Sequence, residues 1–523
     1  MGNIIGSTEP WAVVSFNAAS SSNVNQFLDD DLASGQVPYL FTYDASQPVD
    51  VVLHSQSNTT DSESLAVSVA DLPSRTSSAS SISPESMQVH PAPYVDRPED
   101  VTVAIEVKYI FPFLAPDAVD PAPHDPRPIQ RVPDPSNPSA ISGLANALIA
   151  QTIRSVAGEP AVTSEVIKAN GKKERHFWDS HWIVKKAGSP EPRENELSIE
   201  GYVWTTVEII SHKYLATDPG TRDRIKGVLN TLLSSYRVVA NYTCDTHIHL
   251  GREDNQAFTL ETLQRLATLA WPAEKTLRSI RDPKSNNYHN IWTWGFETTN
   301  SRLGVAVSGV TGSATDLILT QDGLGIPDAQ IVRAIAAQPS MPARELKIFQ
   351  EIWKRDSHRS LGKLLSGKYR RYRRLGLNFS MFGLEDNRSR INPRTMEFRF
   401  MEGTIDASLA ANWVVICARI VELAVLRSDD RYERSLRGVL QRIGNGTSQL
   451  SAGKERGAQM GQEFRELMED LGVPKDVFGP FEAKVTRENC WEPGVRPVDF
   501  WENTGWDCAE SDGEDGEKVS ANL

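Results

Sequence analysis

Apolar and polar positions follow regular patterns from about Val101 onward in this chain of 523 residues. Val101–Leu114, VTVAIEVKYIFPFL, is mostly apolar and β-branched, which predicts a buried strand. HWIVKK and GYVWTTVEIIS predict two more strands, and TCDTHIHLG predicts a strand whose side chains alternate between two faces. Shorter strands are expected over LGLNFSMF and TMEFRFMEGT.

Helical spacing appears between and after these strands. Amphipathic helices are expected over ISGLANALIAQTIRSVA, DPGTRDRIKGVLNTLLSSYRVV and FTLETLQRLATLAWPAEKTLRSI, and again over Asp328–Ala337 and Ala343–Arg355. ASLAANWVVICARIVELAVL is almost wholly apolar and predicts a buried helix. Because strands and helices mix without a regular βαβ rhythm, the pattern predicts an α+β fold.

The two ends of the chain have a different composition. Residues 1–99 are largely rich in Ser, Thr and Pro, which predicts a disordered leader. A globular domain is expected over 100–430, with a Pro-rich insertion at 115–140. Residues 431–507 predict a helical extension, and 508–523 form an acidic segment that we expect to be a disordered tail.

The charge balance narrows the range of partners. Lys and Arg total 55 against 68 Asp and Glu, and the net charge of -13 disfavours binding to nucleic acid or to an anionic membrane. We expect a cytoplasmic protein, because the first residues lack a signal-peptide pattern and no later segment approaches membrane-spanning length. The four cysteines show no C-x-x-C spacing, so neither a zinc ribbon nor a disulfide framework is expected.

Two histidines share one face of the strand predicted at TCDTHIHLG. His247 and His249 can converge on one metal ion or anion, although two histidines on a half-buried strand can also simply hydrogen-bond to their neighbours. With Asp245 they resemble the first metal strand of amidohydrolase-type metallohydrolases. That class needs two further histidines on later strands, and only His289 and His358 follow, so hydrolysis is the less favoured alternative.

A carboxylate and a guanidinium lie two residues apart in MEFRFMEGT. Alternation places Glu397 and Arg399 on one face and Phe398 and Phe400 on the other. The two charged groups could form a structural ion pair. They also suit a phosphate-handling site, in which Glu397 holds Mg²⁺ and Arg399 presents fixed donors to phosphate oxygens.

Six segments in this order resemble a known family. AIEVKYIF, HWIVKKAGS, VEIISHKYL, CDTHIHLG, LGLNFSMF and EFRFMEGTIDASLAANWV resemble the amidoligase enzymes of the carboxylate-amine ligase superfamily, which includes glutamine synthetase and gamma-glutamylcysteine synthetase. The resemblance covers about Val101 to Arg427. It implies an antiparallel sheet that forms an open trough backed by helices, with Mg²⁺ and ATP in the trough. It further implies that ATP activates a small-molecule or peptide carboxylate as an acyl phosphate, which an amine then converts to an amide.

The resemblance also implies roles for individual residues. The acids that match metal ligands are Glu106, Glu208 and Glu397. His247 and His249 would lie near the metal or the phosphates, and Arg399 would contact phosphate, as catalytic residues. Asn378 would contact substrate or cofactor. The basic stretch KYRRYRRLG adds Arg370 and Arg373 as candidates for nucleotide binding, with a solvated basic loop as the alternative.

Departures from the family pattern motivate a second hypothesis. Lys108 stands where the family places a second acid on the opening strand, and an ammonium there would repel a second Mg²⁺. The acid expected before Gly188-Ser189 is replaced by Ala187. These changes favour, as the alternative to a ligase, a catalytically impaired relative that binds a nucleotide or a peptide.

Overall fold

The described part of the chain forms two compact units, Met1–Val95 and Asp96–Leu523. The computed structural model describes residues 40–42, 52–54, 94–190, 201–241, 243–281, 295–296, 301–311, 325–338, 340–368, 374–383, 394–427, 429–444 and 453–488. Most of the leader expected at 1–99 and all of the tail expected at 508–523 lie outside these residues. Within the first unit, β1 (Leu40–Thr42) pairs antiparallel with β2 (Val52–His54).

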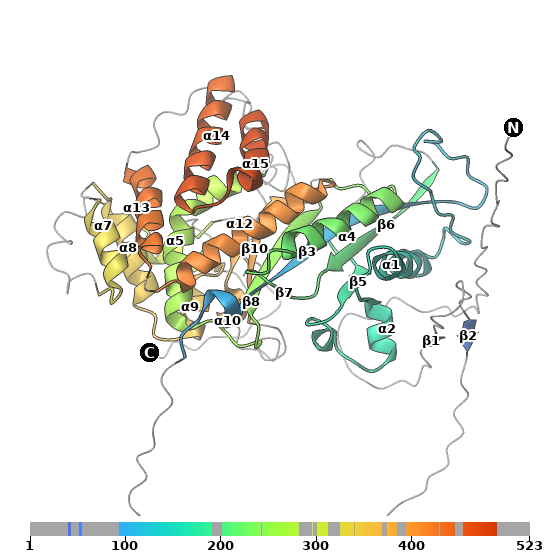
Figure 1. The fold of residues 1–523 in the computed structure, drawn as a ribbon, viewed down its shortest axis with the longest axis horizontal. Helices are drawn as coiled ribbons and strands as arrows, with labels where there is room; N and C mark the ends of the chain where they lie inside the picture. The colour runs from blue at the N-terminus through green and yellow to red at the C-terminus, as the bar shows by residue number, and fades with distance from the viewer. Residues whose placement is uncertain are drawn as a thin grey trace, which may run out of the picture. The chain divides into compact units, whose positions relative to one another are not determined.

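The second unit begins at Asp96, whose buried carboxylate accepts hydrogen bonds from the backbone and hydroxyl of Thr259. Its centre is an eight-stranded sheet in the order β4-β5-β6-β3-β8-β10-β9, with β7 paired to β3 (Figure 1). All of its strand pairs are antiparallel except β4 with β5, so the predicted α+β class is confirmed. The strands are β3 (Val101–Leu114), β4 (Ala161–Thr163), β5 (Trp182–Lys186), β6 (Tyr202–Ile210), β7 (Tyr214–Leu215), β8 (Asp245–Arg252), β9 (Leu377–Asn378) and β10 (Met396–Glu402).

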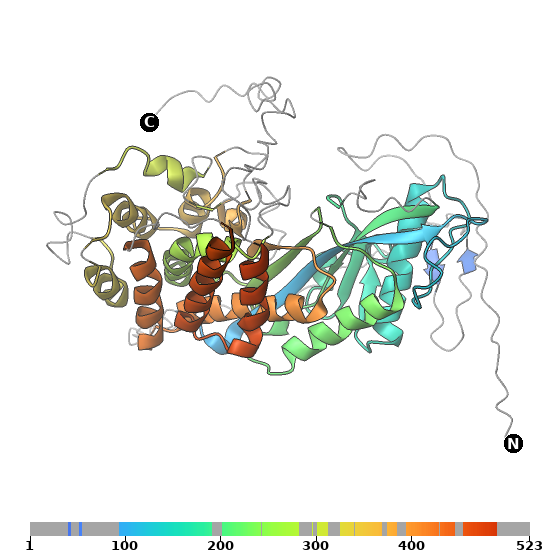
Figure 2. The same cartoon turned by 90° about the horizontal axis from the view of Figure 1, so that it is seen from above.

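One face of this sheet is covered by α1 (Pro138–Ser155), α4 (Thr221–Ser235) and α12 (Ala407–Val425), as Figures 1 and 2 show. The odd-numbered apolar residues of β3, such as Ile105 and Val107, are buried in the core shared with these helices. Because successive side chains of a strand point to opposite faces, the even-numbered Glu106 and Lys108 lie on the other face. The helices therefore cover the apolar face of β3, and its charged side chains lie on the opposite face.

The remaining helices surround the α12 side of the unit or connect the strands. α5 (Leu260–Arg278) packs against α12, and α14 (Gly453–Asp470) packs against α15 (Lys475–Glu488). The other elements are η1 (Pro98–Asp100), α2 (Ser164–Ala169), η2 (Glu174–His176), α6 (Arg302–Ala306), α7 (Ala329–Ala336), α8 (Ala343–Trp353), α9 (His358–Leu364), α10 (Ser380–Gly383) and α13 (Asp430–Gly444). The Pro-rich segment expected at 115–140 has no helix or strand before Pro138. Its position is held by the guanidinium of Arg237, which donates hydrogen bonds to Asp120 and to the carbonyl of Arg127.

Helix α12 corrects one expectation from the sequence. Among the described residues, α12 is the one helix that is long enough and apolar enough to cross a membrane. The expectation that no segment approaches membrane-spanning length is therefore wrong. Most of its residues are nevertheless buried inside the unit, as predicted for this segment. Trp413 is fully buried and its ring packs near the rings of Phe398 and Phe481.

The strand expected over LGLNFSMF is shorter than predicted. Strand β9 ends at Asn378, and α10 begins at Ser380. The side-chain oxygen of Asn378 accepts hydrogen bonds from the backbone nitrogen and the hydroxyl of Ser380. Such a local side-chain contact offers the backbone an alternative to the sheet and turns the chain out of it.

Replacing Gly403 by alanine is expected to lower the free energy of unfolding by about 1–3 kcal/mol, because overpacking displaces the backbone. A Cβ at Gly403 would lie 2.3 Å from the Cβ of Cys244, and the Gly403 backbone nitrogen donates to the Cys244 carbonyl. Urea unfolding measures the change. The control is Gly227→Ala in α4, where nothing lies within 4 Å of the new Cβ; equal stability of the two variants would contradict this packing.

Candidate functional site

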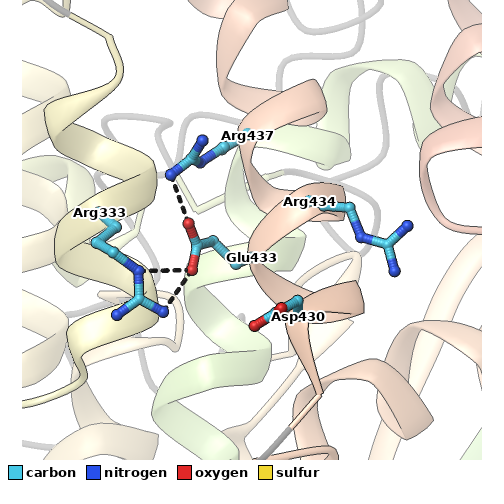
Figure 3. A pocket seen from close by; sticks show the side chains of 5 residues that line it. All are labelled: Arg333, Asp430, Glu433, Arg434 and Arg437. Carbon is cyan, nitrogen blue, oxygen red and sulfur yellow. Dashed lines mark hydrogen bonds and ion pairs between the residues drawn. The ribbon is translucent and has the colours of Figure 1, made fainter.

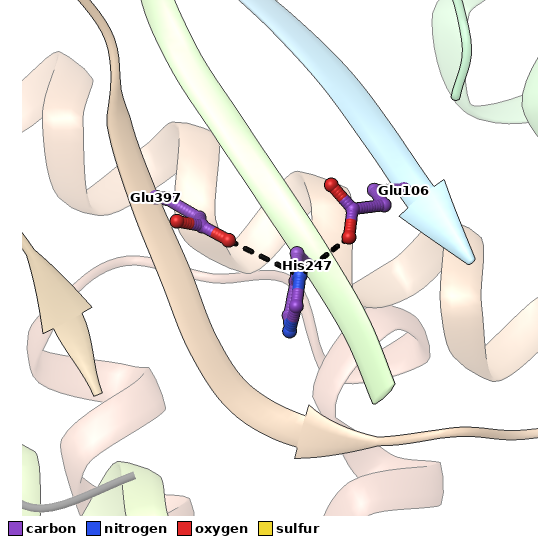
Figure 4. A group of neighbouring side chains, drawn as sticks. All are labelled: Glu106, His247 and Glu397. Atoms are coloured by element: carbon purple, nitrogen blue, oxygen red, sulfur yellow. Dashed lines mark hydrogen bonds and ion pairs between the residues drawn. The ribbon is translucent and has the colours of Figure 1, made fainter. Parts of the chain in front are cut away.

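Three neighbouring strands bring one histidine and two carboxylates together. Glu106 on β3 lies opposite His247 on β8, and Glu397 reaches the same histidine from β10. The Nδ1 atom of His247 lies 2.8 Å from Glu106 Oε1 and 3.1 Å from Glu397 Oε1 (Figure 4). The His247 side chain is only 1% exposed, so these contacts form away from bulk solvent.

His249 extends this group toward solvent. Its Nε2 atom lies 3.3 Å from Glu106 Oε2, and its side chain is 27% exposed. Both histidines therefore contact Glu106, which confirms that they share one face of β8. Asn378, expected to contact substrate or cofactor, donates a side-chain N–H to Glu397 Oε2 at 2.7 Å and so holds that carboxylate in place.

Arg399 lies at the edge of the same group. Its Nη1 atom donates to Glu397 and lies 3.4 Å from His247 Nδ1. The guanidinium is buried, and a shift in the β8–β10 register between Phe398 and Met401 interrupts the regular alternation around it. The contact between the two side chains nevertheless shows that Glu397 and Arg399 lie on one face, as predicted.

Arg281, which the sequence reasoning missed, supports this irregular part of β10. The side chain is fully buried and donates to the backbone carbonyls of Arg399, Phe400 and Met401. It also forms an ion pair with Asp245 at 3.0 Å. Arg281 is therefore a positioning residue, since it fixes the backbone that carries Arg399.

Glu208 does not join the predicted set of metal ligands. Its Oε1 atom lies 3.1 Å from Lys185 Nζ, a residue that the sequence reasoning also missed. Lys108 lies beside it and places its Nζ atom 3.4 Å from Glu106 Oε1. Lys108 thus stands opposite Glu208 on the Glu106 side, and Lys185 contacts Glu208 from the far side, on β5.

Burial and neighbouring charges set the protonation of the group. Burial, together with the positive charges of Arg399 and Lys108, lowers the pKa of His247 to about 4, so this imidazole is neutral at pH 7. Burial alone would raise the pKa of Glu397, but Arg399 and the two histidines hold it below its usual range. Burial likewise opposes ionisation of Glu106, whose pKa is held well below the usual range by His247, His249 and Lys108. Both carboxylates are therefore ionised at neutral pH.

The donor set fits one divalent cation. One potential ligand atom from each of Glu106, His247 and Glu397 lies within 4.8 Å of the others. Two carboxylates and a neutral imidazole suit Mn²⁺ or Zn²⁺ well, and Mg²⁺ through the oxygens. The Nε2 atom of His247 has no hydrogen-bond partner in the described part of the chain, and it lies 3.8 Å from Asp245 Oδ2.

Other candidates from the sequence lie elsewhere or outside the described residues. Arg370 and Arg373 lie outside them, but Arg374 from the same basic stretch is described and exposed, and its charge acts on His249. His289 also lies outside the described residues. His358 donates its Nε2 proton to the carbonyl of Phe258 at 2.7 Å and takes no part in the group.

An open hollow between α7 and α13 is not on this face. It is lined by Arg333, Asp430, Glu433, Arg434 and Arg437 (Figure 3). Glu433 accepts hydrogen bonds from Arg333 on α7 and from Arg437 on its own helix, so its carboxylate is already paired. The chemistry-bearing residues converge on the sheet instead.

Comparison with known proteins adds no family assignment. No family model matches the chain. No curated protein matches it at a significant level either.

Proposed function

We propose that the chain is an ATP-dependent carboxylate-amine ligase that forms an amide bond, and that its sheet is the open trough of that superfamily. The observation that carries this proposal is the convergence of Glu106, His247 and Glu397 from three strands, with Arg399 beside them. The motifs that supply these residues are the ones on which the resemblance depends. Convergence on one buried face supports a shared chemical role.

Different residues of the site have different roles in phosphoryl transfer. Glu106, His247 and Glu397 would hold a divalent cation, which when bound offsets negative charge on the phosphates of ATP. Arg399 donates to phosphate oxygens from a fixed, buried position, because Asn378 and Glu397 hold its surroundings. Arg281 keeps the backbone of Arg399 in place.

The proposed reaction has two steps. An oxygen of the substrate carboxylate attacks the γ-phosphorus, and the bond from that phosphorus to the oxygen of ADP breaks, giving an acyl phosphate. The amine nitrogen then attacks the acyl carbon, phosphate leaves with the former carboxylate oxygen, and the nitrogen loses a proton. His249 is partly exposed, lies 3.3 Å from Glu106, and can accept that proton when its imidazole is neutral.

A second candidate function has its own supporting observation. Lys108 forms an ion pair with Glu106, and Lys185 forms one with Glu208, so carboxylates expected to bind metal already have internal cations. A chain of this kind could bind a nucleotide without turning it over. In contrast, the described open, mostly antiparallel sheet does not resemble the barrel expected for an amidohydrolase-type metallohydrolase.

ADP release separates these functions. Purified protein is incubated with Mg²⁺, ATP and pools of amino acids, dicarboxylates and amines, and ADP is followed with a coupled assay. The ligase predicts release that requires both a carboxylate and an amine. Nucleotide binding without such release would support the binding protein, and hydrolysis of an amide without ATP would support a metallohydrolase.

A further inference from the structure

Lys108 lies next to the Glu106, His247 and Glu397 group, on the side of strand β6. It stands directly opposite Glu208 in the β3–β6 pairing, and Lys185 stands opposite Glu208 in the β5–β6 pairing. Side chains at paired positions of neighbouring strands lie on the same face. A row of positive, negative and positive charge therefore crosses three strands, from Lys185 through Glu208 to Lys108.

The Lys108 side chain is buried beside the Glu106 carboxylate. Its Nζ atom is 3.4 Å from Glu106 Oε1, and its side chain is only 9% exposed. Burial and the nearby Glu106 raise the pKa of Glu208, while the positive charges of Lys185 and Lys108 oppose that rise. Glu106 is thus shared between two places: the divalent-cation group on one side and Lys108 on the other.

Ion pairs on this face already join acids to bases before any ion is added. Lys108 pairs with Glu106, Lys185 with Glu208, Arg281 with Asp245 and Arg399 with Glu397. Lys185 also contacts the Glu174 carboxylate at 3.4 Å. One divalent cation at Glu106, His247 and Glu397 adds two positive charges, which suits the phosphates of a nucleotide. A second divalent cation between Glu106 and Glu208 would meet the Lys108 ammonium.

We propose that this face binds a single divalent cation and that the Lys108 ammonium permanently takes the place of a second one. Its role toward phosphate oxygens rests on the proposed ligase function, but the number of ions does not. An ammonium carries one positive charge and three N–H donors on a flexible stem. Unlike a metal ion, it cannot be removed by a chelator.

The test counts Mn²⁺ ions bound per chain, by electron paramagnetic resonance titration of the full-length protein without nucleotide. Ions on the acidic surface are subtracted with Glu397→Gln for the first site and Glu208→Gln for the second. The key variant is Lys108→Glu, which adds a third carboxylate beside Glu106 and Glu208. Lys186→Glu makes the same charge change at an exposed position of β5 and serves as the matched control.

Wild type and Lys186→Glu are expected to bind one Mn²⁺ that Glu397→Gln removes. Lys108→Glu is expected to gain one further ion that Glu208→Gln removes. Two site-specific ions in the wild type, or none, would overturn the proposal, and so would a folded Lys108→Glu protein that still binds one. If Lys108→Glu does not fold, Lys108→Met decides the matter: loss of the ammonium is expected to admit a second ion that Glu208→Gln removes, and a folded Lys108→Met protein that still binds one ion would overturn the proposal.

These outcomes separate the role of Lys108 from the ligase function. A single ion in a protein that releases no ADP would leave the role of Lys108 intact and remove the ligase. Two ions in a protein whose ADP release needs a carboxylate and an amine would do the reverse.

Discussion

Replacing Glu397 by glutamine is expected to reduce carboxylate- and amine-dependent ADP release by about 10³-fold, the scale at which loss of one preorganised electrostatic group slows an enzyme. The carboxylate is shared by three partners: it accepts from Asn378 and Arg399 and lies 3.1 Å from His247. Glutamine keeps the volume but removes the negative charge. The divalent cation would lose one ligand, and the Arg399 guanidinium would lose its buried counter-charge.

The control for this substitution is Glu402→Gln on the same strand. The Glu402 carboxylate pairs with Lys484 at 2.6 Å instead of His247, so the variant removes an equal charge outside the site. Initial rates of ADP release and the Mn²⁺ count are measured for both proteins. A loss below tenfold in Glu397→Gln, or an equal loss in Glu402→Gln, would contradict the assignment of Glu397 to the site.

Replacing Arg399 by lysine is expected to lower kcat by about 10²-fold or more, because arginines that contact the transferring phosphoryl group contribute strongly to its rate. Lysine keeps the charge but lacks the planar fork that donates to two oxygens at once. The site's single Mn²⁺ should remain, since Arg399 is not among the potential ligands. A fall in kcat with an unchanged Mn²⁺ count therefore indicates a phosphate contact.

Two comparisons distinguish loss of a phosphate contact from a purely structural effect of replacing Arg399. Arg394→Lys makes the same change at an exposed position just before β10 and should retain wild-type kcat. Guanidinium chloride at millimolar concentration should partly restore Arg399→Ala, because the free ion can occupy the vacated place. An Arg399→Lys enzyme with wild-type kcat would show that the guanidinium does not contact phosphate.

Alternation was sufficient to predict the strands that carry the site. The apolar run at Val101–Leu114 and the two alternating segments around His247 and Glu397 became β3, β8 and β10. Their residues converge because these strands are neighbours in the sheet, an arrangement that only the family resemblance implied. Local pattern therefore predicts which face of a strand each residue occupies, but it does not predict which strands are neighbours.

The parts that were missed depend on contacts between distant segments. Arg281 follows a helix and looks like an ordinary helix-terminal arginine, yet it holds the carbonyls of β10 because the strand is irregular there. Lys185 contributes to this face because it lies opposite Glu208 on the neighbouring strand β6. The separation of Glu208 from the ligand group follows from the same pairing, which no spacing within β6 reveals.

Transfer of ¹⁸O from the carboxylate substrate to phosphate tests the central claim most directly. The protein is incubated with Mg²⁺, ATP, amines and a mixture of amino acids and dicarboxylates labelled with ¹⁸O in their carboxyl groups, and the released phosphate is examined by mass spectrometry. Activation through an acyl phosphate predicts one ¹⁸O atom in each phosphate released. ATP consumption that yields only unlabelled phosphate would contradict a carboxylate-amine ligase, because water and not a carboxylate would then have attacked the γ-phosphorus.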